Sequence, residues 1–244
     1  MRFGLVSIKT VSGQPEQNLL HIRRCIREYH TQCDVLCFGE SFLQGFSSLL
    51  YEPQEDYRLS TKQDANMIRL LQVWAHKYRI AISFGYFEKE DDKIYSSYLF
   101  IGDDGLVYNN YRRQSKSFSS DNEVYARGEG LKIFKYKDRS FLTTICDDLR
   151  DETIAKKINE SGVDVVLWPI YMSDGHVFKV GNIACVEHLK PLVLMINAYD
   201  ESTKGGGALF KNGKIVLSLA EKQEGILLID DERLDVIDNQ GLRN

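Results

Sequence analysis

Three groups of side chains in this sequence could carry out chemistry together: an acid, a cluster of cations and a thiol. Glu40, the basic cluster Arg112–Lys116 and Cys146 each follow an apolar segment that is typical of a strand. Ligand sites in open α/β sheets gather beyond the carboxyl ends of strands. A carboxylate can deprotonate a nucleophile, a cation can stabilise an oxyanion and a thiolate can carry an acyl group. The three groups therefore predict a nucleophilic site.

Cys146 is expected at a strand-to-helix corner. The apolar run 141–145 precedes it, and the charged segment Asp147–Glu152 follows it and is typical of the first turn of a helix. A helix N-terminus favours the thiolate form of a cysteine, whereas the acidic pair Asp147 and Asp148 disfavours it. We expect Arg150 to neutralise Asp148 on the same turn. The alternative interpretation of Cys146 is a small buried apolar residue.

Composition limits the class of protein. The 244 residues are 43% hydrophobic and 27% charged, which is enough for one large globular domain over residues 1–244. The net charge of −4, with both signs interspersed, argues against nucleic-acid and membrane partners and favours small molecules or proteins. The segment Met1–Ser7 lacks the features of a signal peptide, and no stretch reaches transmembrane length, so we expect a cytoplasmic protein.

The cysteines also favour a reducing compartment. Five cysteines with irregular spacing do not form a disulfide framework. His30, Cys33 and Cys37 could be imagined as metal ligands, but Cys37 lies inside an apolar run and no matching second cluster follows. We therefore predict no metal site.

The elements that must position these groups alternate between strands and helices. Apolar residues recur with a helical period after Pro15 (Leu19, Ile22, Ile26, Tyr29), in Ile68–Tyr78, from Cys146 to Glu160 and around Ile183–His188. Strands are predicted at Arg2–Ile8, Asp34–Phe38, Ile80–Tyr86, Tyr95–Ile101, Leu106–Tyr111, Leu131–Tyr136, Ser140–Ile145, Val163–Trp168, Leu192–Ile196, Gly207–Phe210, Ile215–Leu219 and Gly225–Ile229. Buried strands beside helices, together with hairpins, predict a layered α/β protein with mixed sheets.

Several segments resemble the motifs of the nitrilase superfamily of carbon–nitrogen hydrolases, nearly end to end. Phe38–Phe46 resembles the family's glutamate motif, and Ile145–Glu152 resembles its cysteine motif. Further segments follow in the family's order: Val165–Pro169, Ala184–Glu187, Leu194–Ala198, Gly205–Gly207 and Glu224–Leu227. The resemblance implies a four-layer α-β-β-α sandwich with two mixed sheets. It also implies a Glu-Lys-Cys triad, no metal or organic cofactor, and a homodimer formed through helices near the cysteine.

Carried over to this chain, the resemblance makes Glu40 the general base and Cys146 the nucleophile. The backbone N–H of Asp147 would share the oxyanion with a lysine, and Glu123 would support that lysine. Tyr171, Met172 and His176 would line the substrate pocket, although an ordinary loop is an equal alternative for them.

The lysine is where this chain departs from the family pattern. The pattern places it directly after Tyr-Arg, but here Arg113 follows Tyr111-Arg112, and Lys116 comes three positions later. We predict Lys116 as the catalytic cation, because an ammonium is a compact point charge whereas a guanidinium is a broad planar group. Arg113 is the alternative, and a solvated basic turn is a third interpretation.

The expected function is hydrolysis of a small carboxamide or N-carbamoyl compound through a thioester on Cys146. Two alternatives stay open: a non-catalytic binding or scaffold protein that retains the fold, and an acyl transferase that uses the same thioester. A serine hydrolase is disfavoured because the chain has no Gly-x-Ser-x-Gly segment.

Overall fold

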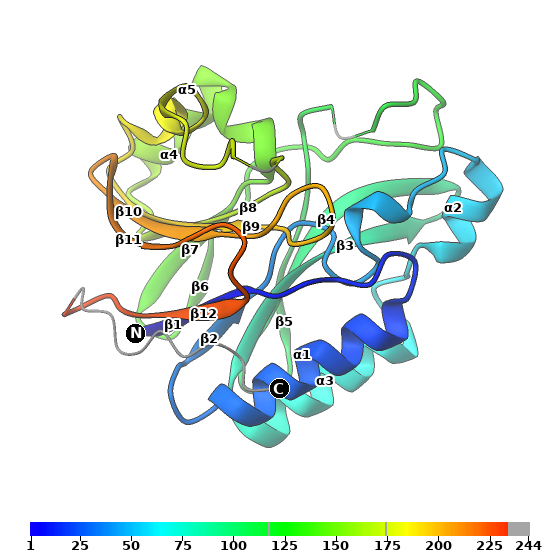
Figure 1. The fold of residues 1–244 in the computed structure, drawn as a ribbon, viewed down its shortest axis with the longest axis horizontal. Coiled ribbons are helices and arrows are strands. Elements are labelled where there is room, and N and C mark those ends of the chain that lie inside the picture. The colour runs from blue at the N-terminus through cyan, green and yellow to red at the C-terminus, as the bar shows by residue number, and fades with distance from the viewer. Residues whose placement is uncertain (117, 174, 234–244) are drawn as a thin grey trace.

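Two six-stranded mixed sheets pack face to face, and helices cover the outer face of each (Figure 1). The computed structural model describes residues 1–116, 118–173 and 175–233. The first sheet contains β1 (Arg2–Ser7), β2 (Val35–Cys37), β3 (Ala81–Glu90), β4 (Lys93–Ile101), β5 (Val107–Arg112) and β12 (Gly225–Asp230). The second contains β6 (Phe134–Tyr136), β7 (Arg139–Thr143), β8 (Val165–Ile170), β9 (Leu192–Asn197), β10 (Gly207–Lys211) and β11 (Lys214–Leu219).

The parallel strands lie at the centre of each sheet, and strands that pair antiparallel lie at the edges. The first sheet has the order β12-β1-β2-β3-β4-β5, with β1, β2 and β3 parallel. The second has the order β11-β10-β9-β8-β7-β6, with β7, β8 and β9 parallel. Such central strands are buried on both faces, which explains their continuous apolar sequences.

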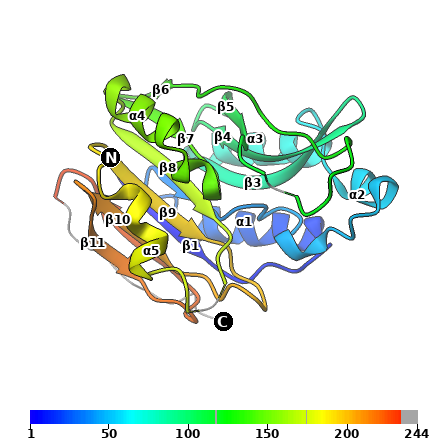
Figure 2. The same ribbon diagram turned by 90° about the horizontal axis from the view of Figure 1, so that it is seen from above.

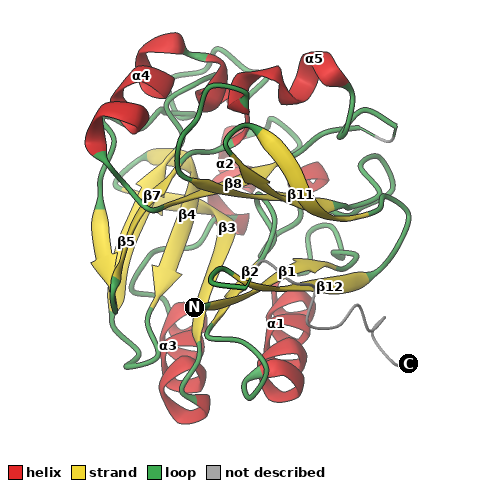
Figure 3. Cartoon of the chain, turned by 90° about the vertical axis from the view of Figure 1, so that its left-hand side faces the viewer, coloured by secondary structure: helices red, strands yellow, loops and turns green. Residues whose placement is uncertain are grey.

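Helices form the two outer layers. α1 (Pro15–Tyr29) and α3 (Asn66–Tyr78) lie side by side on the first sheet, and α4 (Glu152–Ser161) and α5 (Val180–Ile183) lie over the second (Figures 2 and 3). The short helix α2 (Pro53–Leu59) lies beside one end of the sandwich. No helix in the described ranges is long and apolar enough to cross a bilayer.

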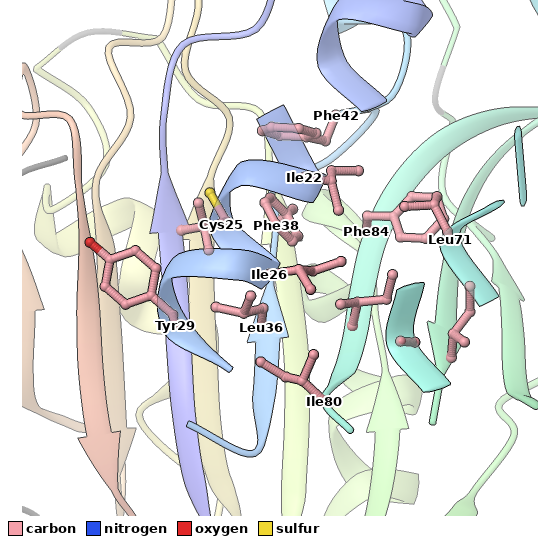
Figure 4. Packing of buried hydrophobic residues seen from close by; sticks show 14 of the residues in the cluster. Ile22, Cys25, Ile26, Tyr29, Leu36, Phe38, Phe42, Leu71, Ile80 and Phe84 are labelled. Atoms are coloured by element: carbon pink, nitrogen blue, oxygen red, sulfur yellow. The ribbon is translucent and has the colours of Figure 1, made fainter. Parts of the chain in front are cut away.

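Three apolar clusters fill the spaces between these layers. One joins α1 and α3 to the first sheet, with Ile22 and Ile26 packed near Leu36 and Phe38 (Figure 4). A second lies between the sheets, and a third lies between the second sheet and its helices. The predicted four-layer sandwich is confirmed.

Individual elements differ from the sequence prediction mainly at their ends. The continuous helix expected after Cys146 is a 3₁₀ turn, Cys146–Arg150, followed by α4. The segment expected to be helical at 183–188 is divided between α5 and a 3₁₀ turn at Ala184–Val186. The remaining 3₁₀ turn, at Phe46–Ser48, and helix α2 were not predicted.

Candidate active site

Three strand ends bring Glu40, Arg113 and Cys146 to one end of the sandwich. β2 and β3 are parallel, and β5 runs in the same direction because two antiparallel pairings separate it from β3. Residues just beyond β2 and β5 therefore meet at the same edge. Cys146 follows β7 in the facing sheet, and it lies close enough to Glu40 and Arg113 for the charges of both to shift the pKa of its thiol.

Glu40 is a buried carboxylate with one free oxygen. Its side chain is 1% exposed, and Oε1 accepts hydrogen bonds from Arg113 Nη1 at 2.9 Å and Ser96 Oγ at 3.4 Å. Oε2 has no partner among the described residues. Burial raises the pKa of Glu40, and the Arg113 charge opposes this shift. The arrangement leaves one carboxylate oxygen available to accept a proton.

Arg113 is held by four acceptors. Nε donates to Ser115 Oγ at 2.8 Å, Nη1 donates to Glu40, and Nη2 donates to the Lys116 carbonyl at 3.1 Å and Asp147 Oδ2 at 3.4 Å. A guanidinium has five N–H groups. One Nη1 hydrogen therefore has no acceptor among the described residues. Burial opposes the charge of Arg113, but Glu40 and the neighbouring acidic groups, Asp148 among them, together outweigh burial and raise the pKa of Arg113.

The structure does not bring Lys116 to Glu40. The Lys116 side chain is 54% exposed, and its Nζ pairs with Asp121 at 2.7 Å. Strand alternation explains the difference, because successive side chains point to opposite faces. Tyr111 and Arg113 are buried, whereas Arg112 pairs with Glu88 on the other face of β5. Lys116 lies beyond the strand, so it is Arg113 that reaches the position we expected Lys116 to occupy.

Cys146 lies on a sharp turn. Its φ of 49° is in the left-handed region, which non-glycine residues rarely adopt, and such strain clusters at functional sites. Trp168 Nε1 donates to its carbonyl oxygen at 2.9 Å. Burial raises the pKa of the Cys146 thiol to about 12 and the Glu40 charge adds to this shift, while Arg113 and the backbone of Tyr171 oppose it. The resting side chain of Cys146 is therefore a thiol rather than a thiolate.

The two aspartates after Cys146 have different surroundings. Asp148 is fully buried and accepts from the Tyr111 hydroxyl and three backbone N–H groups, of Gln114, Ser115 and Ile145. Asp147 is half exposed and lies between Arg113 and Arg150, whose Nε is 2.7 Å from Asp147 Oδ1. We had expected Arg150 to pair with Asp148, but it pairs with Asp147 instead.

Of the remaining predicted site residues, some lie near Cys146 and others are exposed away from it. Tyr171 follows β8, and its backbone lies close enough to the Cys146 sulfur to lower the pKa of the thiol. The adjacent Met172 N–H donates to Asn197 Oδ1 at 2.8 Å. His176 is exposed beside Lys179. Glu123 is exposed, and its carbonyl accepts from Lys93, so its carboxylate does not approach Arg113.

Sequence reasoning missed several residues that hold this site. Asp148 was considered only as an acid that disfavours the thiolate and pairs with Arg150, and its hydrogen bonds to Tyr111 and to the backbone were not foreseen. Ser96, Trp168 and Asp200 had no signal, because their partners are distant in the sequence. Within the described residues, no group of three or more His, Cys, Asp or Glu side chains could hold a metal ion.

Comparison with known proteins identifies the family. The family model described as carbon-nitrogen hydrolase matches residues 2–203. The chain belongs to the carbon–nitrogen hydrolase family. The resemblance to the nitrilase superfamily is thereby confirmed, and the match includes the segments that carry Glu40, Arg113 and Cys146.

Solved structures of the same fold include other carbon–nitrogen hydrolases. The NitN amidase from Nesterenkonia sp. AN1 is 17% identical, with a TM-score of 0.81 over 94% of this chain and 92% of that chain. A Glu-to-Gln mutant of the Nesterenkonia amidase, 16% identical with a TM-score of 0.81 over 94% and 92% of the two chains, carries acrylamide added to its active-site cysteine. XC1258 from Xanthomonas campestris, 19% identical with a TM-score of 0.81 over 96% and 92%, has an arsenic adduct in its active site. Among curated proteins, no relative matches the chain.

Proposed function

We propose that this carbon–nitrogen hydrolase cleaves a small carboxamide or N-carbamoyl compound through a thioester on Cys146. The observation that carries the proposal is the buried Glu40–Arg113 pair at the Cys146 turn. It supplies a base with a free oxygen, a permanent cation and a thiol. In this proposal Arg113 takes the role that we first assigned to Lys116.

The first half of the reaction forms the thioester. Glu40 Oε2 takes the thiol proton as Sγ attacks the carbonyl carbon, because a thiol of raised pKa needs a base in contact with it. The free Nη1 hydrogen of Arg113 and the backbone N–H of Asp147 donate to the oxyanion. When the tetrahedral intermediate collapses, Glu40 returns the proton to the nitrogen, and ammonia or an amine leaves.

The second half releases the acid. Glu40, again a carboxylate, takes a proton from water as the water oxygen attacks the thioester carbon. The same two donors hold the second oxyanion. Collapse breaks the carbon–sulfur bond, and the sulfur regains a proton from Glu40. The cycle consumes one water and leaves Cys146 as a thiol, and its steps use no group beyond these side chains and backbone donors.

The choice of a small amide rests on chemistry and on the neighbours. An amide nitrogen needs protonation to leave, and Glu40 can supply that proton. The Nesterenkonia proteins are named as amidases, and acrylamide is an addition product at the cysteine of one of them. The Arg113 side chain, which fills the cation position with a planar group held by four acceptors, also supports the competing proposal of a non-catalytic binding protein.

The decisive measurement is ammonia release from a panel of small amides, ω-amides of dicarboxylic acids and N-carbamoyl compounds. We expect Cys146→Ala to abolish release and Arg113→Gln to reduce it by about 10² to 10³-fold, the usual effect of removing an oxyanion donor. Lys116→Ala is the matched control and should retain wild-type rates, because its side chain pairs with exposed Asp121. No release by the wild type from any compound would favour the binding protein.

We further propose that the protein acts as a homodimer through the face of α4 and α5, in a reducing compartment such as the cytoplasm. Val180 on α5 supports this, because its side chain is 74% exposed. Val180→Asp should halve the mass measured by light scattering. Leu20→Asp, at a 55% exposed position on α1 in the opposite helical layer, should leave the mass unchanged. A monomeric wild type would contradict the proposal.

A further inference from the structure

Four side chains from three separate segments meet near Cys146; we call them the Tyr171 cluster. Ser47 Oγ lies 2.9 Å from Tyr171 Oη and 2.8 Å from Asp200 Oδ2, and Tyr171 Oη donates to the same Asp200 oxygen at 2.9 Å. The ring of Phe46 stacks on Tyr171, with centroids 3.9 Å apart and planes at 19°. These residues come from the segment after Glu40, from the end of β8 and from the end of β9.

Asp200 makes this cluster rigid. Its Oδ1 accepts from the backbone N–H groups of Ser202 and Thr203 and from the Thr203 hydroxyl. Burial acts to raise the pKa of Asp200, but hydrogen bonds from Ser47, the backbone and Tyr171 outweigh it and the pKa is lowered. The Tyr171 hydroxyl therefore donates to a fixed and ionised acceptor, which makes a strong hydrogen bond.

β8 and the residue that follows it also approach Cys146 at two points. Trp168 Nε1 donates to the Cys146 carbonyl at 2.9 Å. Three residues later, the backbone of Tyr171 lies close enough to the Cys146 sulfur to lower the pKa of the thiol and so favour the thiolate. The side chain of Tyr171 is thus held by the segment that follows Glu40, while its backbone contacts the sulfur that Glu40 would deprotonate.

We propose that Tyr171 is a positioning residue for the nucleophile: the Ser47–Asp200 contacts of its hydroxyl hold its backbone N–H against the Cys146 sulfur. This inference rests on the proposed role of Cys146 as nucleophile. It differs from the substrate-contact role that the resemblance gave to Tyr171, because the hydroxyl is occupied by Ser47 and Asp200. Its effect is on the ionisation and orientation of the sulfur.

Tyr171→Phe tests this directly, since it removes the hydroxyl and keeps the ring stacked on Phe46. The rate of Cys146 alkylation by iodoacetamide, followed by mass spectrometry across a pH series, should fall about five-fold, the equivalent of one net hydrogen bond. Its pH profile should move to higher pH. Ser47→Ala should also lower the alkylation rate and move its pH profile to higher pH, by a smaller factor. This second variant keeps the test valid if Tyr171→Phe folds poorly.

Two controls separate positioning from general loosening. Tyr108→Phe removes an equivalent hydrogen bond, from Tyr108 Oη to Asp104 Oδ2 at 2.9 Å, on the exposed edge of β5, and should leave the alkylation of Cys146 unchanged. The half-buried Cys185 thiol is an internal reference within every sample. The proposal would be overturned if Cys146 were alkylated at the same rate and with the same pH profile in Tyr171→Phe and in the wild type. It would also be overturned if Cys146 reacted in neither protein.

The readout is independent of the proposed function. If the wild type hydrolyses an amide, Tyr171→Phe should lower kcat with little change in KM, whereas a raised KM at unchanged kcat would indicate a substrate contact and overturn positioning. If no amide is hydrolysed but the alkylation shift is observed, the amidase proposal fails while the positioning of Cys146 by Tyr171 stands.

Discussion

At the scale of single residues, the unusual feature is an arginine, Arg113, that pairs with buried Glu40 where the family resemblance led us to expect a lysine. A guanidinium stays charged under all working conditions, whereas a buried lysine can lose its proton. Arg113 uses four of its N–H groups on Ser115, Glu40, Lys116 and Asp147, which fixes its plane. A fixed donor costs little reorganisation when charge develops on the substrate.

The pH dependence of the rate follows from the Glu40–Arg113 pair. In the proposed mechanism Glu40 acts as a carboxylate, so the rate should fall as pH falls through its pKa, which burial raises above the ordinary value of 4.5. Arg113 opposes this rise by favouring the charged form. Arg113→Gln should therefore shift the acidic limb of kcat/KM to higher pH as well as lowering the maximum. An acidic limb that stays at the same pH in initial-rate profiles would contradict this pairing, and Lys116→Ala provides the unshifted reference.

At the scale of elements, close backbone approach positions the base. Glu40 and Ser41 pass directly over Gly85 of β3: a Cβ at Gly85 would lie 2.2 Å from the Ser41 nitrogen and 2.8 Å from the Glu40 Cα. Ser41 itself has a φ of 49°. The turn after β2 therefore packs directly against the backbone of β3, so a side chain added at Gly85 should displace Glu40.

Gly85→Ala tests this packing. The methyl group meets backbone rather than a flexible side chain, so we expect a loss of about 1–3 kcal/mol in the free energy of unfolding. Activity should fall by at least about ten-fold, since small displacements of catalytic groups have large effects. Gly181→Ala is the matched control, because a Cβ there meets no atom within 4 Å. Urea unfolding and ammonia release would measure both effects, and wild-type values for Gly85→Ala would contradict the argument.

A second element joins the two sheets at the site. Asp148, in the turn after β7, accepts from Tyr111 of β5 and from the backbone of the segment that carries Arg113. A buried carboxylate is tolerated only when its lone pairs are satisfied. Asp148 therefore holds the segment that carries Arg113 close to the turn that carries Cys146, and it can do so without touching a substrate.

At the scale of the whole molecule, the interior between the sheets fixes how the two halves of the site face each other. Phe100 of β4 is fully buried, and its ring centroid lies 5.0 Å from that of Phe134, 5.1 Å from that of Tyr136 and 5.6 Å from that of Phe141. These contacts connect the first sheet to β6 and β7 of the second. Cys146 follows β7, so the same packing places the nucleophile opposite Glu40.

Phe100→Ala should weaken this interface strongly. Truncation of a buried phenylalanine costs about 3–5 kcal/mol in the free energy of unfolding, because contacts are lost and a cavity remains. Leu106→Ala, at a position that is 62% exposed, should change it by less than about 0.5 kcal/mol. Denaturant unfolding compares the two, and similar losses would show that packing between the sheets does not dominate stability.

The order of strands and helices and the location of the reactive groups could be predicted from local pattern. Hydrophobic periodicity is a property of neighbouring residues, so most predicted strands agree with the structure to within a few residues. Glu40 and Cys146 were placed at strand ends for the same reason. Strand alternation from Tyr111 could also have placed Arg113 on the inner face, and this signal was outweighed by the preference for an ammonium.

Only the tertiary structure decided which groups share the site. Lys116 and Glu123 are close to Arg113 in sequence, yet exposed loops carry their side chains away. Ser47, Tyr171 and Asp200 are distant in sequence and meet because three loops converge at the ends of two packed sheets. Sequence by itself determined the periodic elements and the residue types at their ends, because both depend on short-range geometry. The pairing of Glu40 with Arg113 depends on how the strands align in space, which no local pattern encodes.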